Sequence, residues 1–230
     1  MSQNNTNRLF LVRHGENLAN LTLEFSHRRV DYSLTPKGVL QASQTAAYLR
    51  DKGIQEVYAS PLKRAVETAA VIAEPLGLPV VTSENFRELN VGDLENQPPT
   101  PELWAQHNAI IGAWFGGRPE ERFPGGEDYH SITARGAAGL REVIAGKSGR
   151  TILVVAHGGI LIFTLLALLS DIDLGQLMKG MANCAVTEVE AALVDDRLDV
   201  KVISYPSAAH LSGEAADLVS GVLDTSGEDA

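Results

Sequence analysis

The sequence predicts an α/β fold in which helices pack around an open, mostly parallel sheet. Residues 8–20 (RLFLVRHGENLAN) join a strand-like apolar run to Arg13 and His14 and then to a polar segment typical of a helix start. Residues 151–159 (TILVVAHGG) repeat this order, with an apolar strand followed by His157. Ligands of open α/β sheets bind beyond the carboxyl ends of the strands. Both histidines are therefore candidates for chemistry, although one histidine at a strand end could simply hydrogen-bond a loop.

Two proline-containing segments predict helix starts. Thr35-Pro36 supplies an N-cap and a favourable first residue for a helix that runs to about residue 51. Ser60-Pro61 predicts the same start for a helix over residues 61–75. Arg64 would then lie in the first turn, where the helix dipole opposes a cation. Either Arg64 faces an anion, which we favour, or it is a solvated residue paired with Glu67.

Apolar runs and turn residues predict the other elements of the fold. Strands are expected at residues 54–59, 79–82, 151–156, 182–190 and 198–205. Further helices are expected over residues 101–115, 127–146 and 158–169. The largely apolar run 151–156 is typical of a strand at the centre of a sheet.

The segment between the third and fourth strands is predicted to form a lid. Residues 84–101 are irregular and carry Glu88, and residues 101–115 place Trp104, Ile111 and Phe115 at helical spacing. This helix either covers a ligand or packs as an ordinary core-facing helix, since an apolar stripe is typical of both.

One domain is the simplest organisation for this length, because no linker divides the chain. We expect a single domain over residues 1–230, with its core at about 8–205 and the lid insertion at about 84–126. The tail at about 206–230 is expected to be partly helical at residues 215–223.

Composition limits the function classes. A formal net charge of −10 argues against a nucleic-acid surface, but a small phosphorylated ligand needs only a few cations in a cleft. No apolar run approaches the ~20 residues that cross a bilayer, and no secretory pattern is present, so we expect a cytoplasmic protein without membrane contact. The single cysteine, Cys184, forms no intramolecular disulfide; we expect it in the core, within a strand that begins at residue 182.

Four separate segments, in order, resemble the signature of the histidine phosphatase superfamily. They are Arg13-His14-Gly15-Glu16 (the RHG motif) with Asn20, then Ser60-Pro61-Leu62-Lys63-Arg64-Ala65, then Arg87-Glu88-Leu89 before Gly92, and Ala156-His157-Gly158-Gly159. The resemblance covers about residues 8–204. It implies a three-layer α/β/α sandwich around a mostly parallel sheet, of the phosphoglycerate mutase-like type, with a cap or lid insertion. Glu95-Asn96 stands where many members carry Glu-Gly, which leaves the loop path open.

The resemblance also implies roles for individual residues and a reaction without metal or cofactor. His14 matches the nucleophile that becomes phosphohistidine, and Glu88 matches the proton-transfer acid. The groups expected to bind phosphate are Arg13, Gly15, Asn20, Arg64, His157 and Gly158. Arg28, Arg29 and Trp104 are candidates for further contacts with the substrate. The partner is then a small phosphorylated substrate, and the chain could form a homodimer.

Three functions fit these residues. The first is a phosphomonoester phosphatase of the histidine acid type; the second is a phosphoglycerate-type phosphomutase; the third is a catalytically idle phosphate-binding domain. Members that act as mutases carry arginines after the proton-transfer acid, whereas residues 89–117 contain no lysine or arginine. The sequence therefore favours the phosphatase. A metal hydrolase that uses His14 and His157 with a carboxylate is a further rival.

Overall fold

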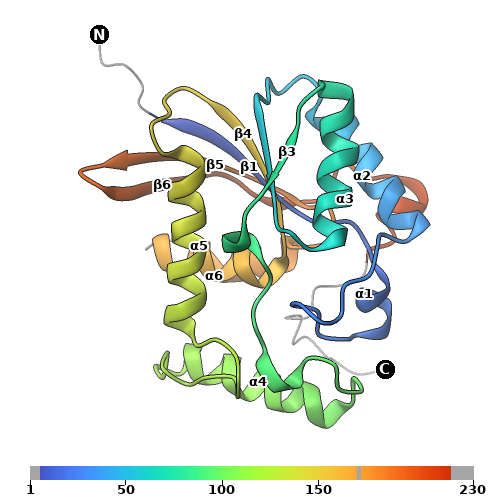
Figure 1. Cartoon of the computed structure of the whole chain (residues 1–230), viewed down its shortest axis with the longest axis vertical. Coiled ribbons are helices and arrows are strands. Elements are labelled where there is room, and N and C mark those ends of the chain that lie inside the picture. Colours follow the sequence, from blue (N-terminus) through green and yellow to red (C-terminus); the bar gives the residue numbers. More distant parts are fainter. Residues whose placement is uncertain (1–5, 170–171, 219–230) are drawn as a thin grey trace.

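A six-stranded mixed sheet forms the centre of the chain in a computed structural model that describes residues 6–169 and 172–218 (Figure 1). The strand order is β3-β2-β4-β1-β5-β6. The strands span Asn7–Arg13 (β1), Glu56–Ala59 (β2), Val80–Thr82 (β3), Thr151–Ala156 (β4), Val186–Val194 (β5) and Arg197–Ser207 (β6). The first four are parallel, and β5 and β6 run antiparallel to their neighbours. The predicted mostly parallel sheet is confirmed, with β4 between β2 and β1 at its centre.

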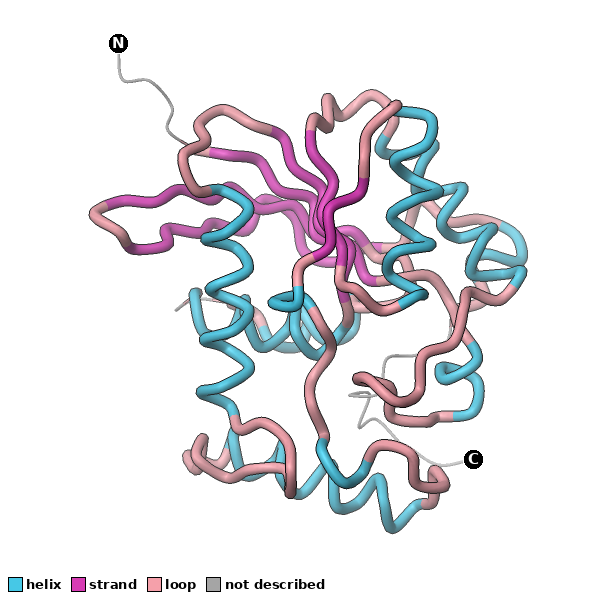
Figure 2. The backbone as a smooth tube through the Cα atoms, viewed as in Figure 1, coloured by secondary structure: helices cyan, strands magenta, loops and turns pink. Residues whose placement is uncertain are grey.

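Helices cover both faces of the sheet (Figure 2). They span Leu18–Thr22 (α1), Pro36–Leu49 (α2), Lys63–Ala73 (α3), Pro101–Phe115 (α4), Tyr129–Ile144 (α5), Gly158–Leu168 (α6) and Leu174–Gly180 (α7). Side chains of β1 alternate between the faces, as strand geometry requires. Phe10 and Val12 pack in the core that α2 and α3 cover, whereas Leu9 and Leu11 pack in the core beneath α5 and α6. The fold is thus the expected three-layer α/β/α sandwich.

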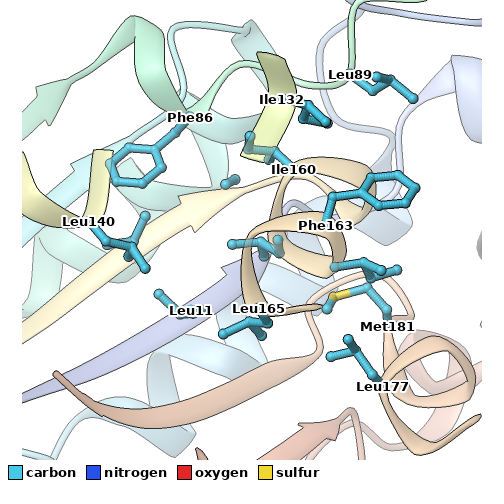
Figure 3. Packing of buried hydrophobic residues seen from close by; sticks show 14 of the residues in the cluster. Leu11, Phe86, Leu89, Ile132, Leu140, Ile160, Phe163, Leu165, Leu177 and Met181 are labelled. Atoms are coloured by element: carbon cyan, nitrogen blue, oxygen red, sulfur yellow. The ribbon is translucent and has the colours of Figure 1, made fainter. Parts of the chain in front are cut away.

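The described residues form three buried apolar clusters. The largest, which we call the larger core, lies between the sheet, α5 and α6 (Figure 3). Leu140 and Ile132 of α5 meet Phe163 and Leu165 of α6 within it, and all four are almost completely buried. α6 is apolar on all sides because the sheet, α5, α4 and α7 surround it. No helix in the described ranges combines the length and the hydropathy that a membrane span requires.

Two predicted boundaries differ from the structure for identifiable reasons. Ser60 does not cap α3, which begins at Lys63 without a side-chain cap; its hydroxyl instead contacts the ring of His157, 2.7 Å away. The fifth helix begins at Tyr129 rather than Glu127, because Asp128 accepts the hydrogen bond of the Ser131 amide as N-cap.

Cys184 is buried as predicted, but it is not part of a strand. It lies in the turn before β5, with a φ of 57°. Burial raises the pKa of its thiol to about 12, so it is a protonated core residue at neutral pH.

α4 packs on a face that is offset from the predicted one. Phe115 is 48% exposed and Trp104 half-buried, whereas Leu103, His107 and Trp114 are buried together with Ile111. The ring of Trp114 lies 5.1 Å from that of Phe163, which fixes α4 against α6. α4 is therefore a packed helix of the larger core, and only part of it faces a ligand cavity, as described below.

Most of the predicted helix at residues 215–223 lies outside the described residues. The described part forms a short 3-10 helix, Gly213–Ala216, in which Ala215 is buried against α2. The other 3-10 turns are Glu74–Leu76, Glu84–Phe86 and Gly92–Leu94, and the last two lie on either side of Glu88.

Two glycines let the loop after β1 lie directly on α2. A Cβ on Gly38 would lie 2.0 Å from the carbonyl oxygen of Glu16, and one on Gly15 would lie 2.6 Å from the carbonyl oxygen of Gly38. Both atoms in the way are backbone atoms, so the loop itself would have to move. This close approach fixes the path of the chain directly after His14.

We predict that Gly38→Ala lowers the free energy of unfolding by roughly 1–3 kcal/mol, the usual cost of overpacking. Gly112→Ala is the matched control, because Gly112 is also helical and a Cβ there meets nothing within 4 Å. That control should be neutral or stabilising by up to ~1 kcal/mol. Urea unfolding measures both, and equal effects would contradict the proposed contact.

Candidate active site

The two strand-end histidines are neighbours because β1 and β4 pair in parallel, with Arg13 opposite Ala156. The amide of His14 donates to the carbonyl of Ala156 at 3.0 Å, so the two chains leave the sheet together. The ring centroids of His14 and His157 are 5.0 Å apart. Both rings are buried.

His14 is held as a neutral ring whose Nε2 is unprotonated. Its Nδ1 lies 2.7 Å from the carbonyl oxygen of Gly15, which can only accept, so Nδ1 carries the proton. Nε2 accepts a hydrogen bond of 3.1 Å from Nε of Arg64. Burial, followed by the charges of Arg64 and Arg13, holds the pKa of His14 well below its ordinary value. At neutral pH, Nε2 is therefore unprotonated, and it is the candidate nucleophile.

Two buried guanidinium groups lie beside this nucleophile. Arg64 donates from both terminal nitrogens to Ser26, to its hydroxyl and its carbonyl oxygen, each at 2.8 Å. Burial lowers the pKa of Arg64 to about 10, so the group stays charged at neutral pH. Arg13 donates to the carbonyl of Met181 at 2.7 Å. Arg64 is thus not the solvated partner of Glu67, whose carboxylate accepts instead from the amide of Leu34.

Several buried polar atoms at or beside the site have no hydrogen-bond partner among the described residues. Among them are Nε of Arg13, Nδ2 of Asn17 and Nδ1 of His157. Burial, with the neighbouring charge of Arg64, also holds the pKa of His157 well below its ordinary value. An unpaired buried donor is costly. An anion in the cavity beside Arg13, Arg64 and the ring of His14 would offset that cost at Arg13, whereas His157 lies behind these groups and does not line the cavity.

Glu88 lies across the cavity from these groups, against the amino terminus of α6. Its carboxylate accepts from the amides of Leu89, Ile160 and Gly159 at 2.8, 3.0 and 3.2 Å. A Cβ on Gly159 would lie 2.6 Å from a Glu88 oxygen, so a glycine is required there for this approach. One cavity is lined by Glu88, His14, Arg13 and Arg64.

The other predicted phosphate-binding residues divide into two groups. Asn20 and Gly158 line the cavity. Asn20 also closes a capping box with Asn17 and accepts from Asn183 at 3.2 Å. Gly15 does not line it, and its amide donates to the hydroxyl of Thr68 at 3.0 Å. Gly15 therefore contributes the carbonyl that orients His14 and not a phosphate-binding amide.

None of the three predicted substrate contacts lines the cavity. Arg28 and Arg29 are exposed. Trp104 is half-buried behind Phe25, with the two rings 4.2 Å apart, and its indole donates to the carbonyl of Leu23. Trp104 therefore supports the cavity wall without forming it.

A single carboxylate, which sequence reasoning did not assign to the site, anchors the loop that carries Ser26. One oxygen of Glu95 accepts from four consecutive amides of residues 27–30, at 2.6 to 3.2 Å. Burial alone would raise the pKa of Glu95, but these amides outweigh it and lower the pKa. The following Asn96 adopts a φ of 68°. Asparagine tolerates this conformation, so it can replace the glycine of the family pattern here.

Sequence reasoning also failed to assign two other residues to the site. Asn183 is fully buried and donates to the carbonyl of His14 at 3.0 Å. His107 of α4 is buried and lines the cavity. The helical spacing of His107 from Leu103 and Ile111 could have indicated a buried position. No local signal marks Asn183.

We predict that Glu95→Ala lowers the free energy of unfolding by roughly 2–3 kcal/mol, because it leaves several amides without their charged acceptor. It should also weaken the binding of inorganic phosphate, since Ser26 would no longer hold Arg64. The folded pKa is lowered, so this stabilisation is complete above the unfolded pKa of about 4.3 and is lost as pH falls through the folded pKa. The difference in unfolding free energy between Glu95→Ala and wild type, measured by urea unfolding, should therefore shrink below about pH 4.

Glu84→Ala is the matched control for Glu95→Ala. Glu84 is a loop carboxylate that pairs with Arg87 at 2.8 Å and is 68% exposed. An exposed pair contributes at most ~1 kcal/mol. Calorimetric titration with phosphate should show no change for this variant, and an equal loss in both variants would remove Glu95 from the support of the site.

Comparison with known proteins agrees with this geometry. Residues 9–201 match the family model of the histidine phosphatase superfamily (branch 1). A probable phosphoglycerate mutase, GpmB, of Yersinia pestis (strain Pestoides F) is 34% identical over 193 residues, which cover 80% of this chain and 84% of that protein.

Solved structures share the fold. A phosphoglycerate mutase from Bacillus anthracis superposes with a TM-score of 0.72 at 22% identity, covering 90% of this chain and 96% of that one. A phosphoserine phosphatase from Entamoeba histolytica, in complex with phosphoserine, has a TM-score of 0.72 at 25% identity, covering 90% and 100%. A mycobacterial glucosyl-3-phosphoglycerate phosphatase has a TM-score of 0.68 at 25% identity, covering 88% and 99%. The chain belongs to branch 1 of the histidine phosphatase superfamily.

Proposed function

We propose that the chain is a metal-independent phosphomonoester phosphatase that works through a phosphohistidine at His14. The observation that carries this proposal is the neutral ring of His14, which presents Nε2 between the buried charges of Arg13 and Arg64. A neutral imidazole is a competent covalent nucleophile. Phosphoryl transfer otherwise needs mainly positioning and charge neutralisation, which the two guanidinium groups supply.

In the first step, Nε2 of His14 attacks phosphorus while the ester P–O bond breaks. The hydrogen bond from Nε of Arg64 to Nε2 is released at this point, and that donor can move to an equatorial phosphoryl oxygen. The proton on Nδ1 stays on its bond to the Gly15 carbonyl, so the phosphorylated ring carries a positive charge beside the dianionic group.

Glu88 is the proposed proton donor and acceptor. Three backbone amides fix the position of its carboxyl group across the cavity from the nucleophile. A carboxylic acid there gives its proton to the departing alkoxide, and the resulting carboxylate then takes a proton from the water that attacks phosphohistidine. The second step releases inorganic phosphate and restores neutral His14.

The lining of the cavity favours hydrolysis over a phosphomutase reaction. A phosphoglycerate-type mutase must bind a substrate with a second anionic group. Among the described residues that line the cavity, Arg13 and Arg64 are the only arginines, and no lysine lines it. The three cations of the lid insertion already have carboxylate partners: Arg87 pairs with Glu84, Arg118 with Glu121 and Arg122 with Asp128.

The mutase remains the second candidate because the Yersinia relative is named as one. An idle phosphate-binding domain is the third, and the unprotonated Nε2 of His14, held by Arg64, argues against it. Two of the similar solved structures are named phosphatases. Their names support hydrolysis by this chain as a proposal.

We predict that quenching in alkaline detergent during turnover traps a phosphoryl group on His14 that is stable to base and labile to acid. His14→Ala should abolish both this label and turnover. His130→Gln is the control, because His130 is an exposed histidine of α5 that does not line the cavity, and this variant should keep both the label and turnover. Label on His157, or full turnover by His14→Ala, would overturn the assignment. Activity should persist in excess chelator; its loss would favour the metal hydrolase.

We predict that Glu88→Gln separates proton transfer from packing. On an alkyl phosphate, whose alkoxide needs a proton, kcat/KM should fall by about 10²–10⁴-fold, the usual contribution of general acid catalysis. On p-nitrophenyl phosphate, whose leaving group needs no proton, the fall in kcat/KM should be much smaller. Equal losses on the two esters would mean that Glu88 acts through shape or electrostatics.

A further inference from the structure

The cavity beyond the phosphate-binding groups has an apolar wall. The side chains that share this character come from four separate parts of the chain: Phe25, Leu89, Val91, Ile162, Phe163 and Met178. Leu89 and Phe163 belong to the same buried cluster, in which Phe163 is part of α6 and Leu89 comes from a separate segment (Figure 3). The wall is therefore continuous with the protein core, and packing keeps its shape.

The polar groups on this side of the cavity provide no positive charge. The ring of His107 stacks on that of Phe25, with centroids 5.0 Å apart, and its Nδ1 contacts Asn108. Burial lowers the pKa of His107, which keeps the ring neutral. Glu24 also lines the cavity. Its carboxylate accepts from the hydroxyl of Thr22 and, at 3.4 Å, from that of Tyr32, without an ion pair.

The two cations of the cavity are both committed to the phosphoryl end. Arg64 contacts the nucleophile directly, and Arg13 precedes it in the chain. A carboxylate elsewhere on the substrate would have to lie against apolar carbon or near Glu24. Burying an unpaired charge in such surroundings is unfavourable.

We propose that the alcohol part of the substrate is uncharged and apolar, an alkyl or aryl group of several carbons that lies along this wall. The cavity selects such esters over those that carry a carboxylate. For the chemistry at phosphorus the inference rests on the proposed phosphatase function, but the binding preference itself does not require turnover.

Binding of non-hydrolysable phosphonates tests the preference directly. Each methylene removed from water is worth about 0.8 kcal/mol when fully buried, roughly a threefold to fourfold gain in affinity. Calorimetric titration should therefore show hexylphosphonate binding at least about tenfold more tightly than ethylphosphonate. 3-Phosphonopropionate should bind no better than ethylphosphonate. The inference would be overturned if hexylphosphonate bound no more tightly than ethylphosphonate, or if 3-phosphonopropionate bound more tightly than ethylphosphonate.

Turnover separates this inference from the proposed function. The kcat/KM for hexyl phosphate should exceed those for ethyl phosphate, 3-phosphoglycerate and O-phosphoserine. If no ester is hydrolysed but the phosphonate series holds, the phosphatase proposal fails and the apolar site stands. If esters are hydrolysed but neither binding nor kcat/KM rises with chain length, the phosphatase stands and the apolar site fails.

Met178→Lys places a cation on the wall at a half-buried position that can tolerate it. This variant should lose most of the advantage of hexylphosphonate and should bind 3-phosphonopropionate more tightly than wild type. Val194→Lys is the matched control. Val194 is 52% exposed at the end of β5 and does not line this cavity, so its substitution adds the same charge elsewhere. An unchanged preference in Met178→Lys, or an equal change in the control, would contradict the assignment of the wall.

Discussion

The burial of two guanidinium groups beside two imidazole rings is the constraint that organises this molecule. Removing Arg13 and Arg64 from water is costly, and each repels a proton on either ring. The structure meets the cost by keeping His14 and His157 neutral and by giving each arginine a carbonyl oxygen, that of Met181 or that of Ser26. Carbonyl groups orient a guanidinium without neutralising it, and the one ion pair that these two arginines make among the described residues, Arg64 with Asp31, is long at 4.0 Å. Much of the positive charge is therefore retained for a ligand.

Loops far apart in the sequence hold this arrangement, and one segment connects most of them. Residues 84–100 carry both Glu88 and Glu95, so the proposed proton donor and the anchor of the Ser26 loop move together. Arg135 of α5 fixes the same segment, since it donates to the carbonyls of residues 85, 87 and 88 and pairs with Glu127 at 2.8 Å. The ring of His27 contacts the carbonyl oxygen of Glu88 at 2.7 Å, and this contact links the Ser26 loop directly to residues 84–100. A substitution in residues 84–100 should therefore affect both the proposed proton donor, Glu88, and Arg64, which Ser26 holds.

The sequence predicted what depends on neighbouring residues, and it missed what depends on distant ones. A strand followed by His14 or His157 is a local pattern, and parallel pairing brings two such ends together without further information. The contacts of Glu95 cross 65 to 68 positions, and that of Asn183 crosses 169. Pattern reasoning has no access to such pairs. Ser60 shows the opposite kind of error. Its local sequence is typical of an N-cap, but in the structure its hydroxyl contacts the ring of His157 instead.

The geometry also separates the parts of the molecule that determine chemistry from those that determine substrate choice. The charged groups lie mainly at the carboxyl ends of central strands and at the start of α3, where sheet pairing and core packing fix them. The proposed alcohol site is built from side chains such as Phe25, Val91 and Met178, which come from loops and a short helix. Loop positions can change with less cost to stability than strand ends. One set of charges can therefore serve esters of different alcohols, and this is consistent with a fold shared by proteins named as a mutase, a phosphoserine phosphatase and a glucosyl-3-phosphoglycerate phosphatase.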